Sequence, residues 1–224
     1  LARVLVLTPY TVAAAVANVA FPLAAALGLA VPFIKARNRR NYFFIALLVL
    51  LALVAALIHL TALGALAIPP WAGLQVALDI VLFIVVVMGG RVIPMFTNNG
   101  VPGTSATRKP SVETVALGSV LVLLAADAVG LHGWPVAAVA VVACVAHLWR
   151  WALWQPWKTL RTPLVWVLHL AYLWVPIHLL LRAISEFGWV TSSLSAHALA
   201  VGAAGGLIIG MMTRTAKGHT GRLL

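Results

Sequence analysis

The sequence contains very few charged residues, and acidic residues are the scarcest of them. Charged side chains make up 8% of the 224 residues, with 4 Asp and Glu against 15 Lys and Arg. Soluble domains carry roughly 25% charged residues, so this composition excludes a water-soluble globular protein. Hydrophobic residues make up 63% of the chain. Since one membrane span takes about 20 apolar residues, the chain has room for about six or seven spans and no sizeable soluble domain.

Cysteine is nearly absent, and so are the motifs of several enzyme classes. The single cysteine, Cys144, lies inside an apolar run, which excludes a disulfide framework. We interpret it as a small buried packing residue. The sequence shows neither the closely spaced histidine pair of a zinc protease nor a phosphate-binding loop. Hydrolytic and nucleotide chemistry therefore have no support, and no catalytic residue is assigned.

Long apolar runs predict an all-α fold, a polytopic bundle of about seven membrane-spanning helices. The first helix is expected to kink near Pro22. No long hydrophilic linker divides the chain, so we expect residues 1–224 to form a single transmembrane domain. The predicted spans are Tyr10–Ile34, Asn41–Ala67, Trp71–Pro94, Val112–Leu131, Pro135–Trp157, Thr162–Ile184 and Ser192–Thr213.

The basic residues alternate between the two sides of these spans. Thirteen of the fifteen Lys and Arg residues fall on one side, and only Arg3 and Arg182 fall on the other. Short cytoplasmic loops carry the excess of Lys and Arg, so we expect the N-terminus outside and the C-terminus in the cytoplasm. The net charge of +11 then reflects topology. The expected partner is the lipid bilayer, and nucleic acid is not expected.

Ionisable side chains at membrane depth are the candidates for function, because a charge inside the bilayer is costly. Nine residues, or two and a half helical turns, separate His169 from His178. These two histidines therefore point to opposite faces of one helix, and we expect only one of them at any single site. The predicted outer layer contains His59, Asp79, Asp127, His178 and His197, and the deeper layer contains His147, Arg150 and His169.

Histidines in a helical bundle suit haem or copper, because neutral imidazole ligates both metals. The small residues that follow His197 would let a flat haem ring approach the backbone. Close helix packing through small residues explains the same run without a cofactor. Tyr172 shares a helix face with His169 and could hydrogen-bond a metal ligand or simply pack. Arg150 could meet a haem propionate or extend to the basic interface.

Two polar stretches stand at predicted cytoplasmic helix ends. The stretch Arg91–Gly100 reads RVIPMFTNNG, in which we expect the helix to break at Pro94 and form a polar turn. Met211–Arg222 reads MMTRTAKGHTGR and is expected to leave the membrane in the same way. Both stretches resemble segments of the NnrS family, as do Leu168–Pro176 and the run from His197 to Gly206. The four stretches occur in the family's order.

The resemblance implies a multi-pass protein of the bacterial inner membrane that contains haem and copper. It also implies a role in denitrification and in resistance to nitric oxide, the expected ligand. The chain would be the C-terminal part of such a protein, with the N-terminal helices of the same protein as missing partners. We expect cofactor contacts from His169, His197, Tyr172, Arg91 and Arg214, and metal ligands from His169, His197, His59 and His178.

Two alternatives come from other functional classes. A proton- or ion-conducting transporter would use the same histidines and aspartates along a water-filled path. A structural subunit of a respiratory complex would satisfy the histidines by hydrogen bonds within the bundle. The sequence does not decide whether the protein is an enzyme.

Overall fold

The computed structural model describes residues 2–67 and 70–219, with residues 2–3, 70–72 and 218–219 described by their backbone alone. Every regular element in these residues is a helix. Seven helices are long and apolar enough to cross a membrane, which confirms the predicted fold class. The elements are α1 Ala2–Leu5, α2 Thr11–Lys35, η1 Arg39–Asn41, α3 Tyr42–Ala62, α4 Pro70–Gly100, α5 Pro110–Ala128, α6 Trp134–Leu153, η2 Pro156–Thr159, α7 Pro163–Ser185, α8 Ser192–His197, η3 Ala198–Gly205 and α9 Gly206–His219.

The second and fifth spans end earlier than predicted, at Ala62 and Leu153. Gly64 follows α3 with φ of 76°, a left-handed conformation that ends a helix. Gln155 follows α6 with φ of 57°, and its side-chain oxygen accepts a hydrogen bond from the Ser105 backbone at 3.1 Å. Pro156 follows Gln155, and the residue before a proline is disfavoured in the α-helical conformation, so α6 stops before the apolar sequence ends.

The prediction that α4 breaks at Pro94 was wrong, since the helix continues to Gly100. A proline inside a helix removes one backbone donor, and the helix can continue when packing supports it. Pro94 is buried. Asn98, expected in a turn, instead stays helical and holds the following loop with its amide. Its Nδ2 donates to the Ala106 carbonyl at 3.0 Å, and its Oδ1 accepts from the Ala106 backbone at 2.7 Å.

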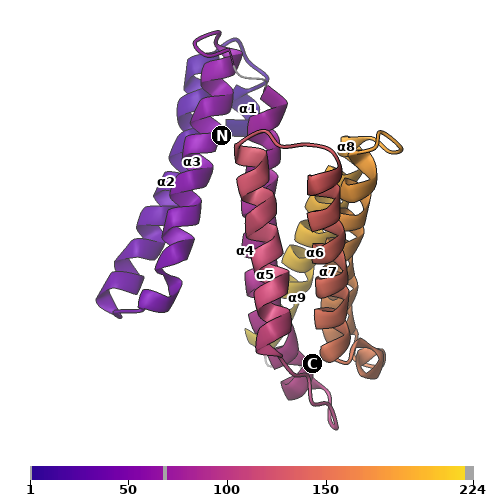
Figure 1. Cartoon of the computed structure of the whole chain (residues 1–224). Coiled ribbons are helices and arrows are strands. Elements are labelled where there is room, and N and C mark those ends of the chain that lie inside the picture. Colours follow the sequence, from indigo (N-terminus) through magenta and orange to yellow (C-terminus); the bar gives the residue numbers. More distant parts are fainter. Residues whose placement is uncertain (1, 68–69, 220–224) are drawn as a thin grey trace. The chain divides into compact units, whose positions relative to one another are not determined.

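The described residues form two compact units, one up to Ile80 and one from Val81 onward. In the first unit, α2 and α3 lie side by side in opposite directions (Figure 1). Asn18 on α2 and His59 on α3 are joined by a 3.0 Å hydrogen bond between Nδ2 and Nε2.

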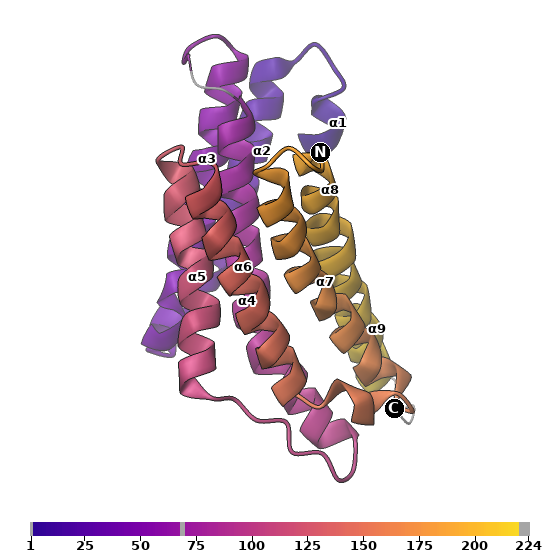
Figure 2. The same ribbon diagram turned by 45° about the vertical axis from the view of Figure 1, so that its right-hand side comes forward.

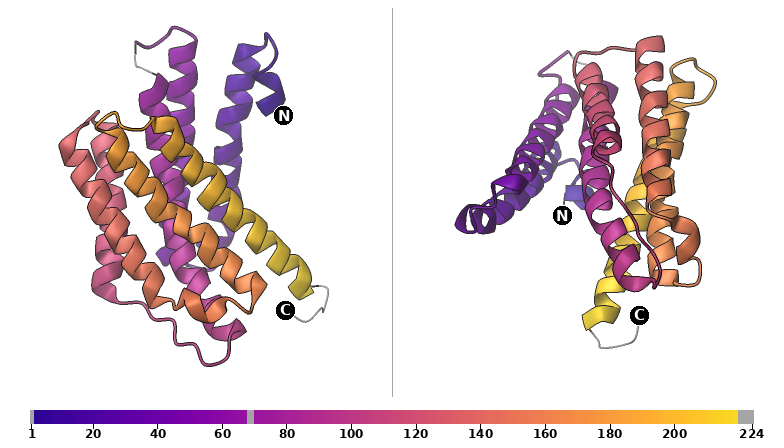
Figure 3. Two further views of the ribbon diagram at one scale, coloured as in Figure 1. Left: turned by 90° about the vertical axis from the view of Figure 1, so that its right-hand side faces the viewer. Right: turned by 60° about the horizontal axis from the view of Figure 1, so that its bottom comes forward.

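In the second unit, α7 is the central helix. It packs against α6 on one side and against α8, η3 and α9 on the other (Figure 2). The α4–α5 loop, the α6–α7 connection and the end of α9 lie at one end of this unit (Figure 3, left). The turns between α5 and α6 and between α7 and α8 lie at the opposite end. This alternation is the arrangement that the predicted loop charges require.

Glycine lets the last membrane span approach α7 closely. A Cβ atom at Gly202 would lie 2.5 Å from Trp174, one at Gly206 would lie 2.9 Å from Ala171, and one at Gly210 would lie 2.9 Å from Leu168. These glycines recur every four residues and form one packing face. Helix packing through small residues therefore accounts for this face.

We predict that Gly202→Ala lowers the free energy of unfolding by about 1–3 kcal/mol, because the new methyl group overlaps the Trp174 ring. The matched control is Gly118→Ala, whose Cβ would meet nothing within 4 Å. That change should leave stability unchanged or raise it by up to about 1 kcal/mol, since alanine favours a helix. Denaturation in detergent measures both values, and equal stability of the two variants would contradict the packing described.

Candidate functional site

The Arg150 guanidinium on α6 is buried and makes several hydrogen bonds, and this residue is 1% exposed. Its Nε and one terminal nitrogen donate to the two carboxylate oxygens of Glu113 on α5, at 2.7 and 2.6 Å. The other terminal nitrogen donates to the Val86 carbonyl at 2.7 Å and to the Tyr172 hydroxyl at 2.9 Å. One side chain thus ties together α4, α5, α6 and α7.

Two adjacent glycines of α4 make room for this cluster. A Cβ atom at Gly90 would lie 1.8 Å from a terminal nitrogen of Arg150, and one at Gly89 would lie 2.9 Å from the Tyr172 ring. Any larger residue would displace the guanidinium or the phenol. Gly89 and Gly90 directly precede the polar stretch Arg91–Gly100, and they make room for the packing around Arg150.

The Tyr172 hydroxyl links Arg150 to His147. It accepts a hydrogen bond from Arg150, and it lies 2.7 Å from Nδ1 of His147. A phenol has one hydrogen to donate, and His147 Nδ1 is the remaining acceptor in contact with it. The chain of hydrogen bonds therefore runs from Glu113 through Arg150 and Tyr172 to His147. His147 is fully buried at its end.

The sequence did not point to Glu113, and neither of the two roles considered for Arg150 is found. Arg150 neither extends to the interface nor stands open to a propionate, because Glu113 occupies its donors. Glu113 also contacts the more exposed Arg108 at 3.3 Å. The signal was available: with 4 acidic residues in the chain, a carboxylate inside a predicted span was the natural partner for a buried arginine.

The two histidines of α7 are both buried, although they point to opposite faces of the helix. His169 is 2% exposed and His178 is 0% exposed. Both faces are covered because α7 is the central helix of the unit. About 1.5 Å of rise per residue places the two roughly 13 Å apart along the axis, so they belong to separate environments.

Hydrogen bonds fix which nitrogen each of these histidines leaves free. Nδ1 of His178 lies 2.7 Å from the Ser195 carbonyl, which can only accept, so Nδ1 carries the hydrogen. Nε2 of His178 has no hydrogen-bond partner in the described residues. In His169, Nε2 contacts the Thr97 hydroxyl at 2.8 Å and Nδ1 has no partner there. In each ring, one nitrogen is held by a hydrogen bond, and the other has no hydrogen-bond partner in the described residues.

His197 is the exposed member of the predicted ligand set. It ends α8, and its Nδ1 lies 2.7 Å from the Ser193 carbonyl, so Nδ1–H is the donor and Nε2 is free to ligate. The π-helical segment η3 begins at the next residue, and such segments are frequent at functional sites. His59 differs, because its Nε2 accepts from the Asn18 amide in the first unit.

The other predicted cofactor contacts are dispersed. Tyr172 bonds to Arg150 and His147. Arg214 on α9 is 8% exposed and stacks on the Phe96 ring, with its guanidinium carbon 4.0 Å from the ring centroid. Arg91 is half-buried on α4. Arg214 follows His197 by seventeen residues, on the order of 25 Å along the helix axis, so one porphyrin does not reach from His197 to Arg214.

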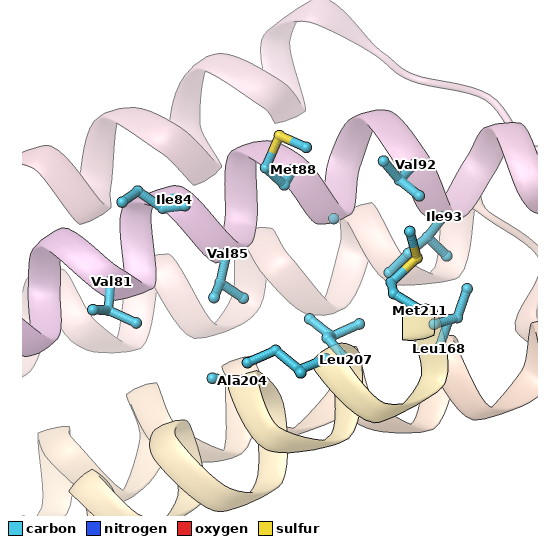
Figure 4. A pocket seen from close by; sticks show the side chains of 12 residues that line it. Val81, Ile84, Val85, Met88, Val92, Ile93, Leu168, Ala204, Leu207 and Met211 are labelled. Atoms are coloured by element: carbon cyan, nitrogen blue, oxygen red, sulfur yellow. The ribbon is translucent and has the colours of Figure 1, made fainter. Parts of the chain in front are cut away.

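An apolar groove of about 400 Å³ lies between α4 and α9, over Leu168 of α7 (Figure 4). On the side of the last membrane span, the lining residues run from Ala204 in η3 to Met211 in α9. The volume falls within the range of small-molecule sites, which is about 300–1,000 Å³. The lining residues are Val81, Ile84, Val85, Met88, Gly89, Val92, Ile93, Leu168, Ala204, Leu207, Ile208 and Met211.

These features fit haem better than copper. Haem iron takes one or two axial ligands and its ring is apolar, so a single exposed histidine near an apolar groove meets its needs. A protein copper site takes several ligands around one ion. Within residues 2–67 and 70–219, no group of three or more His, Cys, Asp or Glu side chains could hold a metal ion. Copper at His169 or His178 would therefore need ligands from outside these residues.

The sequence was compared with models of known protein families. The family model described as NnrS protein matches residues 1–224. The chain belongs to the NnrS family. As an NnrS protein with seven helices able to span a membrane, it is a multi-pass membrane protein of the nitric oxide response. No curated protein and no solved structure was found to be similar.

The NnrS-like stretches described from the sequence lie largely in the second unit. Arg91–Gly100 forms the last part of α4, Leu168–Pro176 is the middle of α7, and His197–Gly206 ends α8 and forms η3. The fourth stretch, Met211–Arg222, is described as part of α9 as far as His219. The side chain of His219 and residues 220–224 lie outside the described residues. Contacts between Thr97 and His169 join the first two stretches.

We predict that Arg150→Gln lowers the free energy of unfolding by about 3–5 kcal/mol, because Glu113 keeps only its contact with the half-exposed Arg108, and the buried Val86 carbonyl and Tyr172 hydroxyl lose their donor. The control is Arg108→Gln, which removes a half-exposed arginine from the same carboxylate. That change should cost less than about 1 kcal/mol. Denaturation in detergent distinguishes the two, and similar losses would contradict the central role of Arg150.

Proposed function

We propose that this NnrS protein binds haem in the membrane, with His197 as an axial ligand, and acts in the response to nitric oxide. The exposed His197 ring, with Nδ1 anchored to the Ser193 carbonyl and Nε2 free, is the observation that supports this most. Metal-binding histidines are usually oriented by such a second hydrogen bond. Bound haem would supply an iron that nitric oxide can bind.

The helix that carries His197 also forms one wall of the apolar groove. Ala204, the first groove residue of this helix, follows His197 by seven residues along the π-helical segment η3. The intervening residues Ala200 and Val201 are exposed. Small and apolar side chains next to the ligand suit a flat apolar ring. His169 and His178 are enclosed by neighbouring helices, so they rank below His197 as haem ligands.

The basic end of the second unit supports a proposal on topology. Arg108 and Lys109 lie in the loop after α4, and Lys158 and Arg161 lie in the connection before α7. We propose that this end faces the cytoplasm of a bacterium, in its inner membrane. Arg91 and Arg214 would then contact an anionic group near the cytoplasmic face, separate from a haem at His197.

We predict that the purified full chain, reconstituted with haem, shows an intense haem absorption band that shifts when nitric oxide is added. His197→Ala should weaken haem binding by at least about tenfold, since even loss of a residue that orients a ligand costs this much. The matched control is His132→Ala, another exposed histidine, which lies in the turn after α5. That control should keep the band and its shift.

Three outcomes would count against this function. A colourless, metal-free and folded protein would contradict haem binding and favour the transporter or structural alternatives. Full binding by His197→Ala with loss in His169→Ala would place the ligand elsewhere. Equal loss in His197→Ala and His132→Ala would mean that neither histidine acts specifically.

For topology, we predict opposite labelling of two introduced cysteines. The native Cys144 is buried, so it provides a low background. Ser105→Cys, in the loop after α4, should react with a membrane-impermeant maleimide only after spheroplasts are opened. His132→Cys, in the turn after α5, should react in intact spheroplasts. The reverse pattern would place the basic end outside and contradict the proposal.

A further inference from the structure

Two buried ring nitrogens on neighbouring side chains have no hydrogen-bond partner in the described residues. They are Nδ1 of His169 and Nε1 of Trp154. His169 is 2% exposed and Trp154 is 0% exposed. Their ring centroids lie 6.4 Å apart, with the planes inclined by 61°. Buried polar groups are nearly always satisfied, so two such atoms on adjacent rings indicate that something binds there.

The contacts of Thr97 fix the hydrogen on His169. The Thr97 hydroxyl oxygen lies 2.9 Å from the Ile93 carbonyl oxygen, and two oxygens at this distance require a hydrogen between them. A carbonyl has no hydrogen, so the single hydroxyl hydrogen points to Ile93. Nε2 of His169, at 2.8 Å from the same hydroxyl, must then be the donor. In the neutral ring, Nδ1 is therefore an acceptor.

The two partnerless atoms have opposite hydrogen-bonding character. The indole Nε1–H of Trp154 can only donate, and Nδ1 of His169 can only accept. An anion would suit the indole but repel the imidazole lone pair, and a cation would suit the lone pair but repel the indole N–H. One small neutral molecule that both accepts and donates would satisfy both atoms. Water is the smallest such molecule, and buried waters commonly bridge polar groups in this way.

The surroundings hold both rings in place. Nε1 of Trp151 donates to the His169 carbonyl at 3.0 Å. The Trp154 ring packs on Tyr172, with centroids 4.7 Å apart, and the Arg150 guanidinium carbon lies 5.3 Å from the Trp154 centroid. Trp154 and His169 therefore lie next to the hydrogen-bonded chain through Arg150, and both side chains are buried.

We propose that His169 and Trp154 form a buried binding site for one water molecule, and that Thr97 sets its orientation by fixing the His169 tautomer. The bound molecule accepts from the Trp154 indole and donates to Nδ1 of His169. Thr97 is a positioning residue, since it acts on the ligand through the imidazole. The site lies beside the buried polar chain of Glu113, Arg150 and Tyr172, because the Trp154 ring packs on Tyr172.

Solid-state NMR of the full chain in lipid vesicles tests this site, with ¹⁵N-labelled histidine and tryptophan and without added metal. We expect the His169 signals of an Nε2–H tautomer, with Nδ1 shifted by an accepted hydrogen bond. Magnetisation should pass from water to the Trp154 indole proton. Trp154→Phe should remove the hydrogen-bond shift at Nδ1. The control Trp149→Phe, which changes an exposed tryptophan of α6, should leave it unchanged.

Substitution of Thr97 tests the positioning role. Thr97→Ser keeps the hydroxyl and should keep the Nε2–H tautomer. Thr97→Val removes it, and a substantial Nδ1–H population should appear while the protein remains folded. An Nδ1–H tautomer in the native protein would overturn the proposal, as would absent water transfer at Trp154 or a metal-coordinated Nδ1 in the isolated protein. These outcomes do not depend on haem at His197, so they test this site separately from the proposed function.

Discussion

A guanidinium in the membrane interior is tolerated only when protein groups replace the water it has lost. Arg150 meets this condition through Glu113, Tyr172 and the Val86 carbonyl, which come from three other helices. No single contact could be removed without leaving a buried donor or charge. The helices of the second unit are therefore tied together by a polar centre, whereas lipid offers little hydrophobic force to hold apolar helices together.

This constraint also explains features of the sequence with no chemical role of their own. Gly90 is required because a methyl group would overlap Arg150, and Gly89 is required because one would overlap Tyr172. On the other side of α7, Gly202 and its successors allow close helix contact. The last span thus has two faces. Its glycines pack on α7, while Ala204, Ile208 and Met211 line the groove.

The number of membrane spans follows from the apolar runs, because a span of given length must be apolar in lipid. Details that depend on tertiary contacts do not follow. The end of α4 was misplaced because Pro94 was expected to end the helix, while buried packing and the Asn98–Ala106 hydrogen bonds carry it onward. The pairing of Arg150 with Glu113 joins residues 37 positions apart.

The histidines show the same limit more sharply. Their depth could be predicted from helical rise, but their free nitrogens are set by Thr97, Ser193 and Ser195, whose contacts are visible only in three dimensions. These contacts separate two enclosed rings from one exposed ring. In the sequence, all three histidines were expected metal ligands at membrane depth. Because of this difference in exposure, we propose haem at His197 and a water molecule at His169.

The most direct test of the assignment at His197 is chemical rescue. In His197→Gly, the missing ring leaves space that free imidazole can occupy as a replacement axial ligand. We predict that His197→Gly binds haem poorly and that added imidazole restores the haem absorption band of the native protein. If His197→Gly shows the native band without imidazole, His197 is not an axial ligand.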